Sequence, residues 1–130
     1  MLVDTDVLIW HLRGLPRATQ RLDQLPRLTI SAITWLELLH GMRSRTELQA
    51  VQKSLALRNT EQLPVTPEIT TRAISLMESL TLSHGLGIGD ALIAATALEH
   101  GLPLLTANVK HFGPIKGLVI ERFDLTQDAS

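Results

Sequence analysis

The sequence predicts an α/β domain whose mainly parallel sheet is covered by helices on both faces. Strand-like and helix-like segments alternate along the whole chain, which is the order typical of parallel sheets joined by helical crossovers. The strand-like segments are short and apolar, as expected for strands buried on both faces. A length of 130 residues, with 45% hydrophobic and 19% charged residues, suits one globular domain with a single core. We expect this domain to span residues 1–125, followed by a short polar tail at 126–130.

The N-terminal segments predict two strands and a helix. Residues 2–3 are apolar and begin the first strand, and residues 7–12 are apolar again after an acidic turn. Residues 28–33 are rich in β-branched side chains and predict the second strand. Residues 34–42 then predict a helix, which ends in a loop of arginine and serine.

The middle of the chain predicts two helices around a short strand. Apolar residues recur at helical spacing over 46–57, and residues 63–65 predict a strand. Thr66 is a typical N-cap because a proline follows it at the first helical position. Gly85 is a typical residue for the end of the helix that Thr66 begins.

The last third predicts a buried helix between two strands. Residues 90–100 form a helix that is apolar on almost every side, and Gly87 and Gly89 mark the loop before it. Residues 104–106 and 118–123 predict the two final strands.

Composition excludes several classes of protein. The chain has no cysteine, which excludes disulfides and thiolate metal sites. No apolar run reaches the ~20 residues that span a bilayer, and no signal-peptide pattern is present, so we expect a cytoplasmic protein that does not enter a membrane. The net charge of −1 gives no overall attraction to nucleic acid. Any polyanion site must be a local patch, and six arginines in the first third of the chain either form one or are scattered and solvated: Arg13, Arg17, Arg21, Arg27, Arg43 and Arg45.

Two acidic residues stand at the ends of predicted elements. Asp4 follows the first strand directly. Asp90 lies in the first turn of the helix over 90–100, on the same face as Ala94 and Ala97, and this face is expected to turn inward. A carboxylate at this position either caps the helix and interacts favourably with its dipole, or binds a metal, and both can hold at once.

Glu37 lies on the polar side of the helix over 34–42, opposite Trp35 and Leu38. This polar side either faces solvent or lines a cleft. Because the helix follows a strand directly, Glu37 lies within about one helical turn of the end of that strand.

If the sheet is parallel, Asp4, Glu37 and Asp90 lie at the same edge. Three carboxylates gathered there would repel one another and resist ionisation, and a hard divalent cation removes this conflict. Mg²⁺ accepts a few carboxylates, keeps several waters and suits phosphate substrates, with Mn²⁺ as an alternative ion. A zinc site gets no support, because the spacing of the five histidines matches no zinc motif. A Ser-His-Asp site gets none either, because the chain lacks a G-x-S-x-G elbow.

The ordered set of these segments resembles the PIN domain, and most closely the VapC-type toxins of bacterial toxin–antitoxin pairs. The matching segments are LVDTDVLI at 2–9, ISAITWLELLHG at 30–41, GIGDALIAATALEHGLPLLTANVKHF at 87–112 and LVIERF at 118–123. The resemblance implies a three-layer α/β/α domain with a mainly parallel sheet of about five strands. It also implies a metal-dependent endoribonuclease that acts on RNA as a homodimer and is inhibited by a VapB-like antitoxin.

The resemblance also assigns residues. Asp4, Glu37 and Asp90 match the family's first three acidic positions and are the expected metal ligands. Asn108 matches the fourth, where many members carry aspartate, and we expect it to belong to the catalytic set, just past the strand at 104–106.

Two further residues are secondary candidates. Asp6 stands where relatives often carry Asn or Ser and would stabilise the turn through its side chain. Thr106 would touch the acidic cluster or a phosphate. His111 and Phe112 match a family segment to which we assign a packing role.

Two rival interpretations stay open at this point. The sequence DTDV at residues 4–7 also fits the nucleophile motif of haloacid-dehalogenase-type phosphatases, in which Asp4 would be phosphorylated. The other rival is a PIN-like fold without catalytic activity that only binds RNA or a partner protein, and Asn108 in place of an acid is the observation that favours it.

Overall fold

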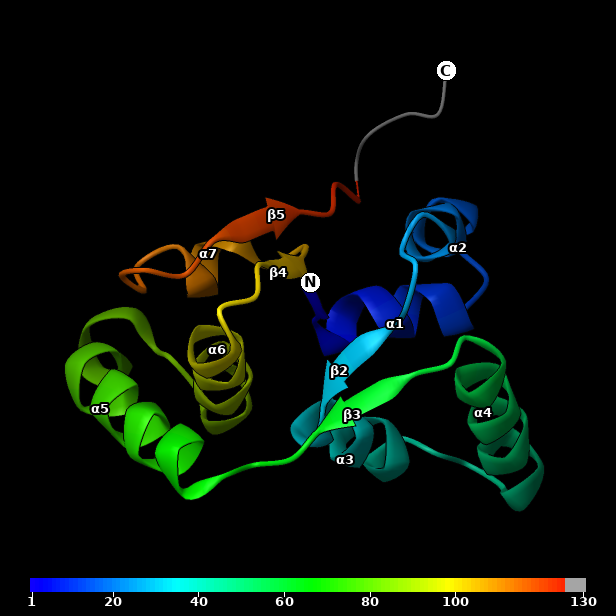
Figure 1. Cartoon of the computed structure of the whole chain (residues 1–130), viewed down its shortest axis with the longest axis horizontal. Coiled ribbons are helices and arrows are strands. Elements are labelled where there is room, and N and C mark those ends of the chain that lie inside the picture. The colour runs from blue at the N-terminus through cyan, green and yellow to red at the C-terminus, as the bar shows by residue number, and fades with distance from the viewer. Residues whose placement is uncertain (126–130) are drawn as a thin grey trace.

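The computed structural model describes residues 1–125, and within them seven helices surround five short strands (Figure 1). The tail predicted at 126–130 lies outside the described residues. In chain order the elements are β1 (Leu2–Val3), α1 (Thr5–Leu12), α2 (Pro16–Asp23), β2 (Thr29–Ser31), α3 (Ala32–His40), α4 (Arg45–Leu57), β3 (Glu61–Leu63), α5 (Pro67–His84), α6 (Ile88–His100), β4 (Leu104–Thr106), α7 (Val109–Phe112) and β5 (Ile120–Arg122).

Every strand pairing is parallel, which confirms the predicted sheet type. Strands β1, β4 and β5 form one sheet in that order, and β2 pairs with β3 in a second. Residues of β1 and β2 lie within 8 Å of each other, Cα to Cα, but form no ladder, so the five strands are hydrogen-bonded as three plus two. Strand β1 is only two residues long because Asp4 already serves as the N-cap of α1.

The strands separate two hydrophobic cores, as a three-layer arrangement requires. Leu2 and Leu104 face the core formed with α5, α6 and α7, whereas Val3 and Leu105 face the core formed with α1, α2 and α3. All four side chains are fully buried. Figure 1 shows α5 and α6 on one side of β4 and β5, and α1 and α2 on the other. The predicted α/β/α layering is confirmed.

Helix α6 is the most deeply buried of the described helices in the core that contains Leu2 and Leu104. Ala91, Ala94, Ala95 and Ala97 are all fully buried, because α6 packs between α5 and the strands. Short side chains let both neighbours approach the helix closely, and this explains why a helix with almost no polar face occurs in the sequence.

Several element boundaries differ from the sequence prediction. Ser31 ends β2 and caps α3 by accepting a hydrogen bond from the Ile33 amide, so the predicted strand at 28–33 is too long. Strand β3 begins two residues before the predicted 63–65. Helix α2 was missed because it is mostly polar and buries only Ala18 and Leu22.

The long helix α5 begins and ends as predicted. Thr66 accepts a hydrogen bond from the Ile69 amide, 3.2 Å away, and Gly85 ends the helix with a φ of +70°. None of the helices over residues 1–125 combines the length and apolar character needed to cross a bilayer.

The packing of α6 predicts the effect of a larger side chain. Ala94→Leu should lower the free energy of unfolding by about 1–3 kcal/mol, because a close-packed core cannot accept three added carbons without displacing its neighbours. Ala56→Leu, at an exposed position of α4, is the matched control and should change it by less than about 0.5 kcal/mol. Urea unfolding curves measure both, and equal midpoints would contradict the described packing of α6.

Candidate active site

Parallel pairing brings the carboxyl ends of β1 and β4 side by side, and Asp4 lies directly after β1. Its Oδ1 accepts a hydrogen bond from the Thr5 amide at 2.8 Å, which caps α1, and its Oδ2 accepts one from Thr106 Oγ1 at 2.7 Å. Only 5% of Asp4 is exposed. The sequence prediction that Thr106 touches the acidic cluster is confirmed.

Asp6 reaches the end of β4 from the first turn of α1. Its Oδ2 accepts a hydrogen bond from the Ala107 amide at 3.1 Å and lies 3.4 Å from Thr106 Oγ1. Its Oδ1 is buried and has no hydrogen-bond partner among the described residues. Asp6 therefore places a second carboxylate beside Asp4. The sequence alone predicts only a turn-stabilising role for this residue.

Burial makes these two carboxylates hard to ionise. Burial, followed by the nearby negative charge of Asp6, raises the pKa of Asp4 to about 8, and Asp90 adds a smaller effect in the same direction. Burial also raises the pKa of Asp6. The hydrogen bonds from Thr106 and Thr5 act against the shift at Asp4 without cancelling it. At neutral pH this pair retains a proton unless a cation replaces it.

Asp90 is the third residue of α6 and approaches the same edge. The N-cap of α6 is Gly87 and no side chain caps the helix, so of the two alternatives for Asp90 the structure contradicts side-chain capping. Instead, Asp90 Oδ2 lies 3.2 Å from His111 Nδ1, and that nitrogen lies 2.8 Å from Asn108 Nδ2. Asn108 lies two residues past β4, at the start of α7, which agrees with the predicted position just past the strand.

The sequence assigned a packing role to both His111 and Phe112. The structure confirms it for Phe112, which is fully buried, but His111 is half-buried and contacts Asp90 and Asn108. The signal available in the sequence was the spacing of three residues between Asn108 and His111, which places both side chains on one side of a helical turn.

Glu37 joins the site through α3. Its Oε1 accepts a hydrogen bond from Thr5 Oγ1 at 2.7 Å, and that hydroxyl lies 3.0 Å from Thr34 Oγ1. Its Oε2 lies so close to Gly89 that a Cβ atom there would approach it to 3.0 Å. Glu37 therefore lies between the first turns of α1 and α6, where it contacts Thr5 and Gly89, the residues that follow Asp4 and precede Asp90 in the chain.

None of these four acids forms an ion pair with a lysine or arginine of residues 1–125. Within the same residues, no three Asp, Glu, His or Cys side chains converge into a ready-made metal-binding group. The acids are thus gathered at one edge, and each is held by a neighbouring threonine, amide or imidazole.

Comparison with known proteins identifies the family. Residues 1–113 match the family model of the PIN domain. The chain belongs to the PIN-domain family. Ribonuclease VapC10 of Mycobacterium tuberculosis is 42% identical over 116 residues, which cover 86% of this chain and 85% of the relative. The present chain is therefore a VapC-like PIN domain. None of these matches is to a phosphatase.

Solved structures of toxin–antitoxin complexes share its fold. A toxin–antitoxin complex from Klebsiella pneumoniae contains a chain that is 31% identical with a TM-score of 0.79, and the match covers 95% of this chain and 98% of that one. A DNA-bound VapBC from Salmonella typhimurium gives 26% identity and a TM-score of 0.79, covering 93% and 96%.

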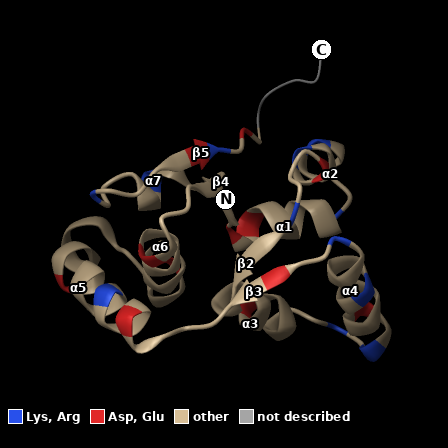
Figure 2. Cartoon of the chain, viewed as in Figure 1, with Lys and Arg blue, Asp and Glu red and all other residues tan. Residues whose placement is uncertain are grey.

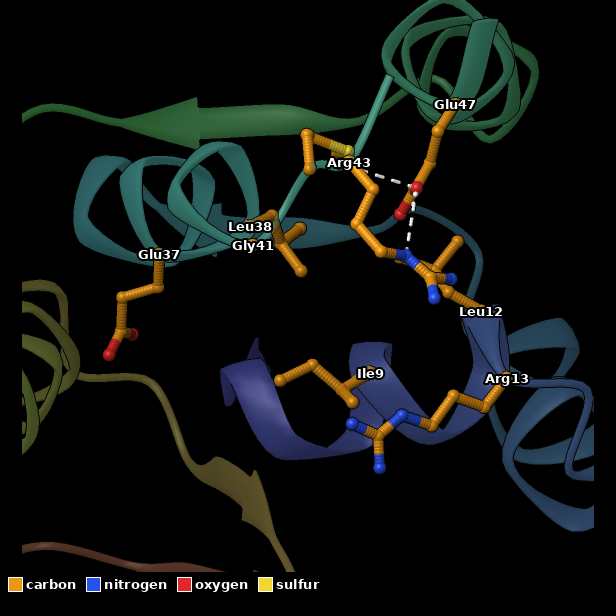
Figure 3. Close-up of a pocket in the computed structure, with 9 residues that line it drawn as sticks. Ile9, Leu12, Arg13, Glu37, Leu38, Gly41, Arg43 and Glu47 are labelled. Atoms are coloured by element: carbon orange, nitrogen blue, oxygen red, sulfur yellow. Dashed lines mark hydrogen bonds and ion pairs between the residues drawn. The ribbon is translucent and has the colours of Figure 1, made fainter.

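A cleft of about 380 Å³ opens beside the acids of this PIN domain, between α1 and α3 (Figure 3). Glu37 stands at one end, and Arg13 and Arg43 stand at the other. Glu37 and Gly41, from the polar side of α3, line this cleft, which agrees with the sequence alternative that this side lines a cleft. The lining residues are Ile9, Leu12, Arg13, Glu37, Leu38, Gly41, Met42, Arg43 and Glu47.

The six arginines do not form one patch in this PIN domain. Arg21 pairs with Glu121 at 3.0 Å and Arg27 with Glu61 at 3.7 Å, so both bind acids on other elements. Arg13 and Arg43 face the cleft, where Arg43 Nε lies 3.5 Å from Glu47 Oε2. Figure 2 shows the basic residues spread over α2, α4 and the loops, with acidic residues at the start of α1.

The raised pKa of Asp4 predicts how stability depends on pH without added metal. A carboxyl whose pKa is higher in the folded protein contributes stability at low pH, and this is lost as pH rises from about 4 towards about 8. Asp4→Asn should remove this loss and exceed the wild type in free energy of unfolding at pH 8 by more than about 1.4 kcal/mol, the equivalent of one pKa unit.

The measurement is urea unfolding in chelator across this pH range. Glu78→Gln, at an exposed position of α5, is the matched control and should follow the wild type. If Asp4→Asn also follows the wild type at every pH, Asp4 is not a buried acid that resists ionisation.

Proposed function

We propose that this VapC-like PIN domain is a metal-dependent endoribonuclease and the toxin of a toxin–antitoxin pair. The observation that carries the proposal is the group of four acids at the edge formed by β1 and β4, and none of them pairs with a lysine or arginine of residues 1–125. Asp4 is buried, Asp6 and Asp90 are half-buried, and Glu37 is exposed. The relative VapC10 is named a ribonuclease, which agrees with a phosphodiester substrate. RNA is the proposed substrate and the cytoplasm the proposed location.

The donor atoms fit a hard divalent cation. Asp6 Oδ1 is buried without a partner, and the pKa of Asp4 is raised by burial and by Asp6, so a positive charge at this edge would be strongly stabilised. Mg²⁺ keeps several waters and needs only one or two protein carboxylates. A preformed group of three ligands is therefore not required. We propose that Asp4, Glu37 and Asp90 hold Mg²⁺ or Mn²⁺.

When bound, the ion would activate a water for attack on the scissile phosphorus and offset negative charge on the leaving oxygen. The residues of this chain supply orientation. Thr106 orients the Asp4 carboxylate by donating a hydrogen bond to it, and Thr5 orients the Glu37 carboxylate in the same way. Asn108 offers a neutral amide that can donate to a phosphate oxygen. No side-chain nucleophile is needed.

A VapB-like antitoxin is the proposed partner. The Klebsiella and Salmonella structures are complexes of toxins with antitoxins. The cleft has an apolar floor and the acids at one end, so it suits an amphipathic segment that places a basic side chain beside Glu37. We also propose that the toxin is a homodimer, which sedimentation of the free protein tests.

Asp90→Asn tests the proposed role of the acids. His111 can still contact the new amide, so the variant should fold. Its stability in chelator should equal or exceed that of the wild type because repulsion with Asp4 is relieved. Cleavage should fall by at least about 100-fold, because an amide oxygen binds a hard cation far more weakly than a carboxylate does.

The measurement is cleavage of a labelled RNA in Mg²⁺, in Mn²⁺ and in chelator. Glu68→Gln, an exposed acid in the first turn of α5, is the control and should cleave like the wild type. Full activity of Asp90→Asn would contradict the metal site. RNA binding by the wild type without cleavage under any metal condition would favour the non-catalytic alternative.

The proposed partner predicts behaviour in cells. Expression of this chain alone should slow growth, and the neighbouring small open reading frame should restore growth and copurify. Leu12→Glu should reduce copurification by at least about tenfold, because it places a charge on the apolar wall of the cleft. Leu57→Glu, an exposed apolar position outside this cleft, is the control. Equal copurification of both variants would mean that the partner binds another surface.

A further inference from the structure

His111 contacts two candidate site residues through a single ring nitrogen. Its Nδ1 lies 3.2 Å from Asp90 Oδ2 and 2.8 Å from the terminal amide of Asn108. Asp90 is in α6, His111 is in α7, and Asn108 lies at the start of α7, two residues past β4. The ring therefore connects the acid of α6 to the segment that follows β4.

Hydrogen-bonding capacity decides where the proton lies. An ionised carboxylate only accepts, so Nδ1 must carry hydrogen to bind Asp90. The opposite tautomer would direct a nitrogen lone pair at the carboxylate. A hydrogen bond to a charged acceptor is about twice as strong as one between neutral groups, so Asp90 outweighs Asn108 in fixing the tautomer.

The same proton also orients the Asn108 amide. Asn108 Nδ2 lies 2.8 Å from Nδ1, and two donors cannot bind each other. With Nδ1–H as a donor, the amide is therefore flipped relative to this placement, so that its oxygen accepts from the ring and its two N–H groups point away. The oxygen and nitrogen of an asparagine amide are distinguished by such contacts. Asn108 is thereby prepared as a donor on the side opposite the imidazole.

The neighbours of His111 in the chain are held in place by packing and hydrogen bonds. Phe112, the next residue, is fully buried in the core against α6. The backbone N–H of Asn108 donates to Thr106 Oγ1 at 2.9 Å, and this hydroxyl donates to Asp4 Oδ2 at 2.7 Å. A continuous series of contacts thus runs from Asp90 through the imidazole and the end of β4 to Asp4.

We propose that His111 is a positioning residue of this site, which through Nδ1–H fixes the Asp90 carboxylate and turns the Asn108 amide so that its N–H groups are available to a phosphate. The cation and phosphate in this inference rest on the proposed function. The arrangement of hydrogen bonds does not, and one of the two measurements below is independent of any activity.

Three substitutions separate positioning from simple packing. In His111→Asn the amide nitrogen stands where Nδ1 stood, whereas in His111→Gln it stands near the former Nε2, and His111→Ala removes both. Mn²⁺ affinity from calorimetric titration should fall by about 10–100-fold in His111→Ala and His111→Gln, the usual effect of losing a partner of a metal ligand. His111→Asn should stay within about threefold of the wild type, since it keeps the donor.

His100→Asn, at the exposed far end of α6, is the control and should bind Mn²⁺ like the wild type. Urea unfolding in chelator accompanies each titration. A packing role would lower the stability of all three His111 variants and leave their Mn²⁺ affinity unchanged, and this result would overturn the inference.

The second measurement is a long-range ¹H–¹⁵N NMR spectrum of the histidine rings in metal-free protein at about pH 8, above the usual pKa of histidine. The inference predicts the Nδ1–H tautomer for His111. In Asp90→Ala the preference for this tautomer should be lost, and both tautomers should be populated. A dominant Nε2–H tautomer would overturn it even if the protein cleaves RNA. If the wild type binds no Mn²⁺, the metal of the proposed function is wrong, and this spectrum alone then decides the inference.

Discussion

The parallel pairing of β1 with β4 is the constraint on which the rest of the structure depends. Its register sets Leu2 against Leu104 and Val3 against Leu105, and these four side chains begin the two cores on opposite faces. The same register ends both strands at one edge, so Asp4 and Thr106 meet there. A shift of one residue would exchange the two faces and separate the acid from its threonine.

This edge works against the stability of the fold. Asp4 and Asp6 are carboxylates with raised pKa values, and one oxygen of Asp6 is buried without a hydrogen bond. The cost is concentrated at the start of α1, where the helix amides and the residues around Thr106 offset only part of it. The two cores on either side must supply the remaining stability. Such a local conflict inside a well-packed domain is typical of a site that binds a ligand of opposite charge.

The acids and the cleft form one continuous surface that is acidic at one end and basic at the other. Glu37 belongs to both, since it accepts a hydrogen bond from Thr5 beside Asp4 and also lines the cleft that ends at Arg13 and Arg43. An inhibitor that lies in this cleft would reach the acids without any movement of the strands. Substrate and inhibitor would therefore compete for the same end of the cleft, which links the proposed activity to its proposed control.

The resemblance of the sequence to the PIN domain assigned Asn108, while the sequence pattern by itself determined the fold class, the parallel sheet and the positions of Asp4, Glu37 and Asp90 near the strand ends. These follow from local spacing, because buried strands, helix caps and the residue after a strand are all recognisable within a few neighbours. Only the tertiary structure decided that Asp6 reaches Ala107, that His111 contacts Asp90, and that the strands pair as three plus two. The physical reason is distance along the chain: Asp6 and Ala107 are 101 residues apart, and His111 and Asp90 are 21 apart. No local pattern encodes such contacts, which arise only when the two cores have packed and brought α1, α6 and α7 to the same edge.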